Sequence, residues 1–332
     1  MSWINKKNIN TIRVNELLEE CNNTNQYTNG GNIVNKLENF IRYNFKIDDN
    51  KDIICVCNAT MAIWCLCNSI EFKYNKKLKW ATQSFTFPSS AQGLLQDTLI
   101  IDIDNDGGLD LSLVPDYIDG IIVTNVFGNV VNIDKYTKWA TDNNKYLIFD
   151  NAATSYTFYK NKNSCNYGNG TIISFHHTKP FGFAEGGAII VDKIYGEECR
   201  RLINFGIHNE KNLPWSTLGG NYKMSEISAI FILQYLENNF TKIVEHHILM
   251  YNKYNNKYHM YPNYGDKENT VLSCFCLLDD KYDELYLEDV IKKGIKCRKY
   301  YKPLINSKIA YEFYNRILCY PLNIDINEIL LD

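Results

Sequence analysis

The chain has 332 residues, a formal net charge of −3 and 45% hydrophobic residues, which is the composition of an ordinary globular protein. This charge balance, with a pI near 6.1, excludes the basic surface that nucleic-acid-binding domains carry. Because single cores stop growing at roughly 250 to 300 residues, the length predicts two domains.

The sequence shows no sign of a targeting or membrane segment. Residues 1–11 lack the apolar core of a signal peptide, and no run approaches the roughly 18 apolar residues of a membrane span. We therefore expect a cytoplasmic protein with no membrane partner. The 11 cysteines are odd in number and often separated by a single residue, so we expect reduced, buried thiols and no metal.

The first predicted elements are two helices, over residues 11–21 and from Ile33 to Ile41, separated by a turn at Asn29-Gly30-Gly31. A strand at 52–57 then leads through Ala59 and Thr60 into a helix that ends near residue 69. Such a strand-to-helix turn presents free N–H groups and the positive helix end to a phosphate. An ordinary helix cap explains the same residues equally well.

Strands and helices alternate over residues 79–150. The pattern predicts strands at 79–83, 98–104, 120–128 and 146–150, and helices at 89–96, 111–117 and 133–142. This alternation indicates a mostly parallel sheet covered by helices, in which ligands collect beyond the carboxyl ends of the strands. Three candidate site residues, Phe87, Asn125 and Asp150, fall at those ends.

Asp150 closes an apolar strand. Burying a carboxylate there is unfavourable unless a cation or several donors meet it, and a protonated pyridine nitrogen is such a cation. A capping or turn aspartate is the alternative interpretation.

Lys179 lies between two apolar runs of the segment from Thr171 to Asp192, which predicts a hairpin-like pair of strands around it. A lysine held inside a fold can lose its proton near neutral pH and attack a carbonyl. We therefore predict a Schiff-base lysine, with an ordinary surface lysine as the alternative.

The chain changes character near residue 240. Helices at 193–205 and 221–238 precede this point, and a strand at 270–278, a helix at 282–294, a strand at 295–301 and a short helix near 326–331 follow it. The predicted domains are therefore a large α/β domain, 1–240, and a small C-terminal α+β domain, 241–332. The N-terminal helix is a candidate to pack on the small domain.

In this order and spacing, several segments resemble the DegT/StrS family of pyridoxal-phosphate-dependent nucleotide-sugar aminotransferases, which have the aspartate-aminotransferase fold (fold type I). The resemblance runs from about Thr28 to Leu322. The segments that carry it are YTNGGNIVNKLENF (27–40), NATMA (58–62), SFTF (84–87), FDNAA (149–153), SFHHTK with AEGGAIIV (174–191), GGNYKMSE (219–226) and YYKPL (300–304).

The resemblance implies a role for each candidate residue. Lys179 would hold the cofactor and move the proton, while Asp150 would pair with the pyridine nitrogen. The remaining cofactor contacts would be Phe87 on the ring face, Ala59, Thr60 and Ser174 on the phosphate, and Asn221 reaching the phosphate of the partner subunit in a homodimer with shared active sites. The candidate substrate contacts are Asn29, Asn125 and Tyr301.

The chain departs from the family pattern at two of these segments. Ala153 stands where the family usually has Gln or His against the ring hydroxyl, and a water or Thr154 is the candidate substitute. Ile305 stands where the family often has a histidine after YYKPL. The chain is also shorter than most relatives, mainly in the C-terminal domain.

The reaction implied is transfer of an amino group from L-glutamate to a nucleotide-linked 4-keto-6-deoxyhexose. The substrate would be UDP- or dTDP-4-keto-6-deoxyglucose and the product a viosamine-type 4-amino sugar, with pyridoxamine phosphate as the amino-carrying form of the cofactor. The alternatives are amination at C3, a pyridoxamine-phosphate-dependent dehydratase in which histidine replaces the lysine, and a catalytically silent binding relative. His176 and His177 lie near Lys179 in the sequence, but the lysine is retained.

Overall fold

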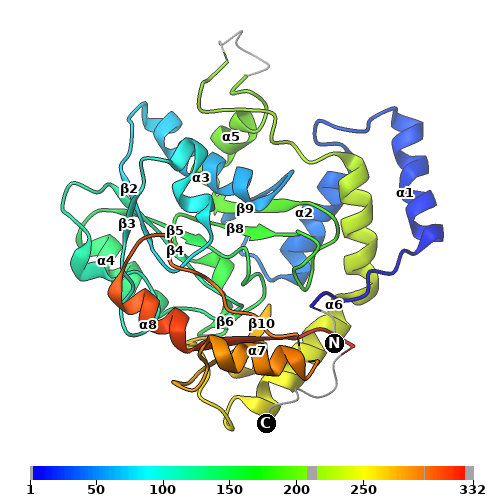
Figure 1. Ribbon diagram of the computed structural model, residues 1–332. Coiled ribbons are helices and arrows are strands. Elements are labelled where there is room, and N and C mark those ends of the chain that lie inside the picture. The colour runs from blue at the N-terminus through cyan, green and yellow to red at the C-terminus, as the bar shows by residue number, and fades with distance from the viewer. Residues whose placement is uncertain (1–2, 208–214, 295, 326–332) are drawn as a thin grey trace.

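The computed structural model of the protein describes residues 3–207, 215–294 and 296–325 (Figure 1). Its centre is a seven-stranded sheet with the order β1-β9-β8-β5-β4-β2-β3. Only β9 runs antiparallel to its neighbours in this sheet, so the α/β fold with a mostly parallel sheet is confirmed. The strands are β1 (Lys51–Val56), β2 (Trp80–Gln83), β3 (Leu99–Ile101), β4 (Gly120–Thr124), β5 (Tyr146–Asp150), β8 (Gly170–Ser174) and β9 (Gly187–Asp192).

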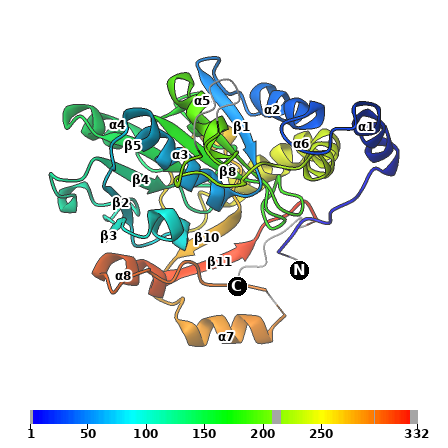
Figure 2. The same ribbon diagram turned by 90° about the horizontal axis from the view of Figure 1, so that it is seen from above.

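Helices cover both faces of this sheet (Figure 2). They are α2 (Asn32–Asn44), α3 (Ala59–Tyr74), α4 (Ile133–Asp142), α5 (Lys193–Leu202) and α6 (Glu226–Tyr254). Along β1, Ile54 and Val56 pack with α3 and α5, while Ile53 and Cys55 pack with α2 and α6. Because both faces are buried, the strands are continuous apolar runs rather than alternating ones.

Glu226, at the start of α6, fixes the position of α2. Its carboxylate accepts hydrogen bonds from the backbone N–H groups of Gly31 (2.8 Å), Ile33 (2.8 Å) and Val34 (3.0 Å). These amides belong to the first turn of α2 and have no intrahelical partners. Helix α1 (Thr11–Thr24) packs outside this pair, against α2 and α6 (Figure 1).

The C-terminal part is built on a two-stranded antiparallel sheet of β10 (Cys274–Leu278) and β11 (Ile317–Pro321), flanked by α7 (Glu284–Lys292) and α8 (Lys308–Arg316) (Figure 2). Strand β10 and helix α7 confirm two predicted elements. The predicted strand at 295–301 is wrong, because its described residues form only an isolated bridge between Arg298 and Cys319. The helix expected near 326–331 lies outside the described residues.

Two further corrections concern short helices. The segments 89–96 and 111–117 form only 3₁₀ turns, at Pro88–Ala91, Gly93–Leu95 and Leu111–Leu113. Gly93 has a positive φ of 54°, which interrupts the first segment, and Pro115 interrupts the second.

Helix α6 runs through residue 240, so the predicted domain boundary falls inside a continuous helix.

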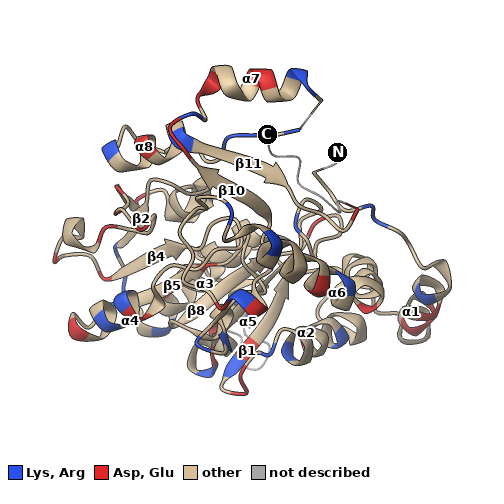
Figure 3. Cartoon of the chain, turned by 90° about the horizontal axis from the view of Figure 1, so that it is seen from below, with Lys and Arg blue, Asp and Glu red and all other residues tan. Residues whose placement is uncertain are grey.

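Acidic and basic residues are interspersed on the outer helices (Figure 3). None of the described helices combines the length and the apolar character that a membrane crossing requires. All 11 cysteines are free and 10 of them are buried, in agreement with the sequence analysis.

A small hairpin of β6 (Phe158–Tyr159) and β7 (Lys162–Asn163) lies in the connection from β5 to β8.

Candidate active site

Several strands bring predicted site residues to one edge of the sheet. Thr124, the last residue of β4, lies opposite Asp150, the last residue of β5. Ser174, the last residue of β8, and Val56, the last residue of β1, both lie opposite Gly187, where β9 begins. Strands β4, β5 and β8 are parallel, so these ends lie on the carboxyl side where ligands of such sheets bind.

Lys179 lies in the connection between β8 and β9, and the predicted hairpin-like pair is confirmed. A tight turn holds its backbone, because the Lys179 N–H donates to the His176 carbonyl (2.8 Å) and the Lys179 carbonyl accepts from the Gly182 N–H (3.0 Å). The side chain is partly buried. Burial lowers the pKa of the Lys179 ammonium, and the negative charge of Asp150 opposes this shift.

Asp150 is buried, with 3% of its surface exposed. Its Oδ1 accepts a hydrogen bond from the Ala152 N–H at 3.0 Å. Burial raises the pKa of the Asp150 carboxyl, and the Ala152 amide and the charge of Lys179 oppose the rise. Because its neighbours are one backbone donor and one lysine, this carboxylate can also pair with a further cation.

The amino end of α3 lies beside the start of β9. The Asn58 side chain caps the Met61 N–H at 2.9 Å, and the Asn58 carbonyl accepts from Ala62. The amides of Ala59 and Thr60, which helix geometry leaves without intrahelical partners, are therefore available to a ligand.

Two features complete this amino end. The Thr60 hydroxyl lies 2.8 Å from the Ser89 hydroxyl, and Ser89 was not predicted as a site residue. A Cβ on Gly187 would lie 2.7 Å from the Ala59 nitrogen, so glycine permits the close approach of β9 to α3.

Ser174 is buried, and its hydroxyl accepts a hydrogen bond from the His176 N–H at 3.1 Å. The ring of His176 contacts Thr178 (Nδ1 to Oγ1, 2.8 Å) and Glu185 (Nε2 to Oε1, 3.5 Å).

Aromatic rings gather at the same edge. Phe87 is 57% exposed, and its ring centroid lies 6.4 Å from that of Tyr301. Tyr301 stacks on Phe127 with centroids 5.4 Å apart. Burial, together with the charge of Asp150, raises the pKa of the Tyr301 hydroxyl well above its ordinary value. Tyr301 therefore belongs to the neighbourhood of Asp150, although 151 residues separate them in the sequence.

Asn125 and Thr154 make hydrogen bonds within the protein. The Asn125 amide donates to Asn151 (2.7 Å) and accepts from the Val131 N–H (3.0 Å). The Thr154 hydroxyl donates to the Asn125 carbonyl (2.6 Å) and accepts from the Gly128 N–H (3.1 Å). Both side chains therefore hold the loops after β4 and β5 together.

The hydrogen bonds of Thr154 matter for Ala153, which lacks the side chain that contacts the ring hydroxyl in the family pattern. The Thr154 side chain is 0% exposed, and its hydroxyl proton is already used in the bond to the Asn125 carbonyl, so Thr154 stays a candidate substitute for Gln or His only as a hydrogen-bond acceptor. The Ala153 carbonyl itself accepts from the Ser273 hydroxyl at 2.5 Å. Ile305, the other departure, is 39% exposed.

Asn29 and Asn221 both lie near Lys223, at the end of β1. Asn29 lines a cavity of about 540 Å³ together with Arg200 and Lys223, and this lining includes neither Lys179 nor Asp150. The Lys223 ammonium donates to the Asn221 side chain at 2.7 Å. Lys223 also forms an isolated bridge with Val56, and the Tyr222 carbonyl accepts from the Cys57 N–H at 2.8 Å, so this segment borders the end of β1 that leads into α3.

The N-terminal segment reaches the lysine turn, which the sequence analysis missed. The Lys7 ammonium donates to the Lys179 carbonyl (3.3 Å) and to the Tyr235 hydroxyl (3.2 Å), and the Asn5 side chain donates to the Pro180 carbonyl (3.4 Å). Burial lowers the pKa of Lys7 to about 7. The segment has no motif or periodicity, so only the tertiary structure reveals its contact with the site.

The residues present fit pyridoxal phosphate. Asp150 is a buried carboxylate that can accept a further hydrogen bond from a ring N–H. The amides of Ala59 and Thr60, together with the hydroxyls of Thr60 and Ser89, suit a phosphate. Lys179 would hold the aldehyde carbon, since burial favours its neutral, nucleophilic form.

Two proteins with similar sequences are named as transaminases of nucleotide-linked amino sugars. The chain is 29% identical over 290 residues to a UDP-4-amino-4,6-dideoxy-N-acetyl-beta-L-altrosamine transaminase of Campylobacter jejuni, covering 80% of this chain and 74% of the relative. It is 27% identical over 227 residues to a dTDP-4-amino-4,6-dideoxy-D-glucose transaminase of Shigella dysenteriae, covering 64% of this chain. That match spans 58% of the Shigella protein, less than two-thirds of its length.

Solved structures share the fold at low identity. A Helicobacter pylori aminotransferase involved in the biosynthesis of pseudoaminic acid superimposes with a TM-score of 0.79 and 20% identity, covering 98% of this chain and 94% of that one. A Bacillus cereus protein described as a PLP-dependent aminotransferase gives a TM-score of 0.81 and 21% identity, covering 96% and 94%.

The sequence matches the DegT/DnrJ/EryC1/StrS aminotransferase family over residues 9–317, nearly the whole chain. That match agrees with the fold and with the arrangement of Lys179, Asp150 and the amino end of α3. The chain belongs to the DegT/DnrJ/EryC1/StrS aminotransferase family.

Proposed function

We propose that this protein is a pyridoxal-phosphate-dependent aminotransferase that moves an amino group from L-glutamate to a nucleotide-linked 4-keto-6-deoxyhexose. The observation that carries the proposal is the placement of Lys179, Asp150 and the amino end of α3 at one edge of the sheet. The names of the two relatives above, both transaminases of 4-amino-4,6-dideoxy sugars, support amination at C4.

Each residue has a task in this reaction. When bound, the cofactor ring supplies the electron sink that transamination requires. The Asp150 carboxylate keeps the ring nitrogen protonated, since a cation beside it offsets the penalty of its burial. The amino end of α3, with Thr60, would hold the phosphate, and Phe87 would contact the ring.

Lys179 serves as the general base. Burial lowers the pKa of its ammonium, so a neutral amine would be available to accept the proton that the substrate carbon must lose and later regain. L-Glutamate would leave as 2-oxoglutarate, and the keto sugar would take up the amino group by the reverse steps.

The cofactor assignment is tested by absorbance. We expect the purified protein, loaded with pyridoxal phosphate, to be yellow and to retain the chromophore covalently after borohydride reduction. Peptide mapping should then place the label on Lys179. Lys179→Ala should fold and bind the cofactor without this covalent link, and should lose turnover. A colourless loaded protein, or near-normal turnover of Lys179→Ala, would refute the assignment.

The substrate is tested with a panel of nucleotide-linked 3-keto and 4-keto sugars, with UDP and dTDP carriers and L-glutamate as donor. Mass spectrometry and NMR of the products identify both the nucleotide and the aminated carbon. Amination at C4 supports the proposal. A 3-amino product, or loss of the C3 oxygen without amination, would instead indicate one of the alternative reactions.

The proposed assembly is a cytoplasmic homodimer with shared active sites. Support comes from Asn29 and Asn221, which both neighbour Lys223 near the end of β1, and from the cavity that Asn29 and Lys223 line, whose lining includes neither Lys179 nor Asp150. This placement is expected if that region completes the site of the partner subunit.

A mixed dimer tests sharing directly. We expect chains carrying Lys179→Ala and chains carrying Asn221→Ala to be weakly active alone and to regain activity when mixed and refolded together. If Asn221 acts across the interface, one of the two sites in the mixed dimer has both residues intact. If Asn221 acts within its own chain, every site stays defective and mixing restores nothing.

A further inference from the structure

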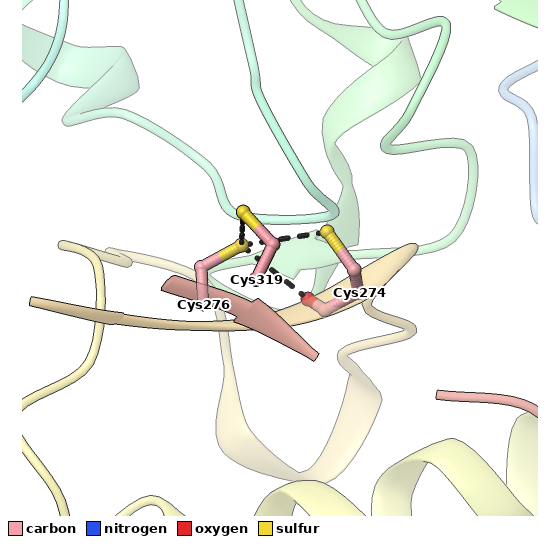
Figure 4. A group of neighbouring side chains, drawn as sticks. All are labelled: Cys274, Cys276 and Cys319. Atoms are coloured by element: carbon pink, nitrogen blue, oxygen red, sulfur yellow. Dashed lines mark hydrogen bonds between the residues drawn. The ribbon is translucent and has the colours of Figure 1, made fainter. Parts of the chain in front are cut away.

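Three buried thiols converge where β10 meets β11. Cys274, Cys276 and Cys319 are 4%, 1% and 0% exposed. The Cys276 sulfur lies 3.4 Å from that of Cys274 and 3.3 Å from that of Cys319, and all three sulfurs lie within 4.8 Å of one another (Figure 4). Among the residues that the structure describes, this is the one group of His, Cys, Asp and Glu side chains with converging ligand atoms.

The strand pairing places the sulfurs together. Cys274 and Cys276 are two residues apart on β10, so their side chains point to the same face. Cys319 lies directly opposite Cys276 on β11. The N–H and carbonyl of Cys319 both bond to Arg298, so Cys276 and Cys319 form a non-hydrogen-bonded pair, the kind in which side chains approach most closely.

The surroundings of the sulfurs are apolar. The same cluster of buried side chains contains Phe85, Phe127 and Tyr261.

We propose that Cys274, Cys276 and Cys319 form a buried three-sulfur site for one Zn²⁺ ion. Sulfurs bound to zinc at about 2.3 Å in tetrahedral geometry lie about 3.8 Å apart. The two pairs that include Cys276 would therefore open by a few tenths of an ångström, and Cys274 and Cys319, which lie within 4.8 Å of each other, would adjust to the same separation. The sulfurs bind as thiolates and release three protons, and an external ligand completes the zinc coordination.

The net charge of the occupied site favours Zn²⁺ over Cu⁺. Three thiolates with Zn²⁺ leave a net charge of −1. The same sulfurs with Cu⁺ would leave −2, which an apolar environment opposes more strongly. The bound ion fixes the register of β10 and β11 beneath Tyr301, so its role is structural and independent of the proposed transamination.

The test measures metal in the protein itself. Because the sulfurs are buried, the ion enters while the chain folds, so the full-length protein is produced in zinc-containing medium and dialysed against a chelator. We expect about one zinc per chain by mass spectrometry, and X-ray absorption showing sulfur ligands at about 2.3 Å. Cys274→Ala, Cys276→Ala and Cys319→Val should each lower retained zinc at least about tenfold.

Cys297→Ala is the matched control, because Cys297 is another buried thiol of the C-terminal part that does not belong to the group. It should retain the zinc. Valine at position 319 keeps the space filled, so this variant removes a ligand without leaving a void. Zinc below about one-tenth per chain, copper in its place, ligands other than sulfur, or zinc retained in all three variants would each overturn the proposal.

Discussion

The burial of His247 predicts that the folded protein loses stability in acid. His247 lies in α6 with 0% of its surface exposed, and a backbone interaction with Leu272 offsets only part of the effect of this burial on its ring. Burial lowers the pKa of His247 to about 3, and the neighbouring His246, with its ring centroid 5.6 Å away, contributes to the shift. The folded protein therefore holds this ring neutral, whereas the unfolded chain protonates it near its ordinary pKa of about 6.5.

The sign and size follow from proton linkage. Between pH 6.5 and 3 the unfolded chain binds more protons, so the folded state loses stability as the pH falls. A shift from about 6.5 to about 3 corresponds to about 2 kcal/mol lost at pH 5 and about 3 kcal/mol at pH 4. At pH 7.5 the ring is almost neutral in both states, so the loss there is close to zero.

The test variant is His247→Leu. It places an apolar side chain of similar size at the buried position and removes the imidazole that titrates. Urea unfolding of the cofactor-free protein at pH 7.5 and pH 5 gives the stability at each pH. We expect His247→Leu to lose about 2 kcal/mol less than the wild type between these values. His259→Gln, at an exposed position, is the control and should follow the wild type. Equal losses in the wild type and His247→Leu would refute the reasoning.

Three further predictions concern the site and its support. Glu226→Gln removes a charged acceptor of three backbone N–H groups, and should lower the free energy of unfolding by about 2–4 kcal/mol in urea titrations. Gly187→Ala places a Cβ 2.7 Å from the Ala59 nitrogen, so α3 must shift, and the measured affinity for pyridoxal phosphate should fall about tenfold or more. The third variant is Asp150→Asn. In the wild type the pKa of the Asp150 carboxyl is higher in the folded protein than in the unfolded chain, where it is near 3.9. Ionisation of Asp150 therefore destabilises the cofactor-free wild type as the pH rises above about 3.9. This variant should therefore have a higher Tm without cofactor at pH 7, yet turn over at least about 100-fold more slowly with it. An unchanged Tm and rate would contradict the burial argument.

The large sheet could be predicted because its strands are local apolar runs separated by turn residues. The order of alternation placed Asp150 and Asn125 at carboxyl ends, and the two apolar runs around Lys179 paired as expected. The C-terminal part was harder. Residues 295–301 have a strand-like composition, but the partner of β10 is the segment Ile317–Pro321, because pairing depends on tertiary packing more than on propensity.

The site shows a similar division. A buried carboxylate at a strand end and a glycine-flanked lysine leave a signal in the sequence, because their chemistry conflicts with their position. Lys7 and Ser89 leave none, because each becomes part of the site only through a contact with a distant segment. Asn125 illustrates the converse, since its position at a strand end suggested a ligand contact whereas its amide joins two loops.

The three sulfurs mark the limit of reasoning from spacing. The one-residue gap between Cys274 and Cys276 differs from zinc-binding spacings, but in a strand it places both sulfurs on one face. What faces them depends on the register of a strand about 40 residues later, and a slip of one residue would turn Cys319 to the opposite face. The spacing that argued against a metal in a loop therefore becomes compatible with one once β11 supplies the third sulfur.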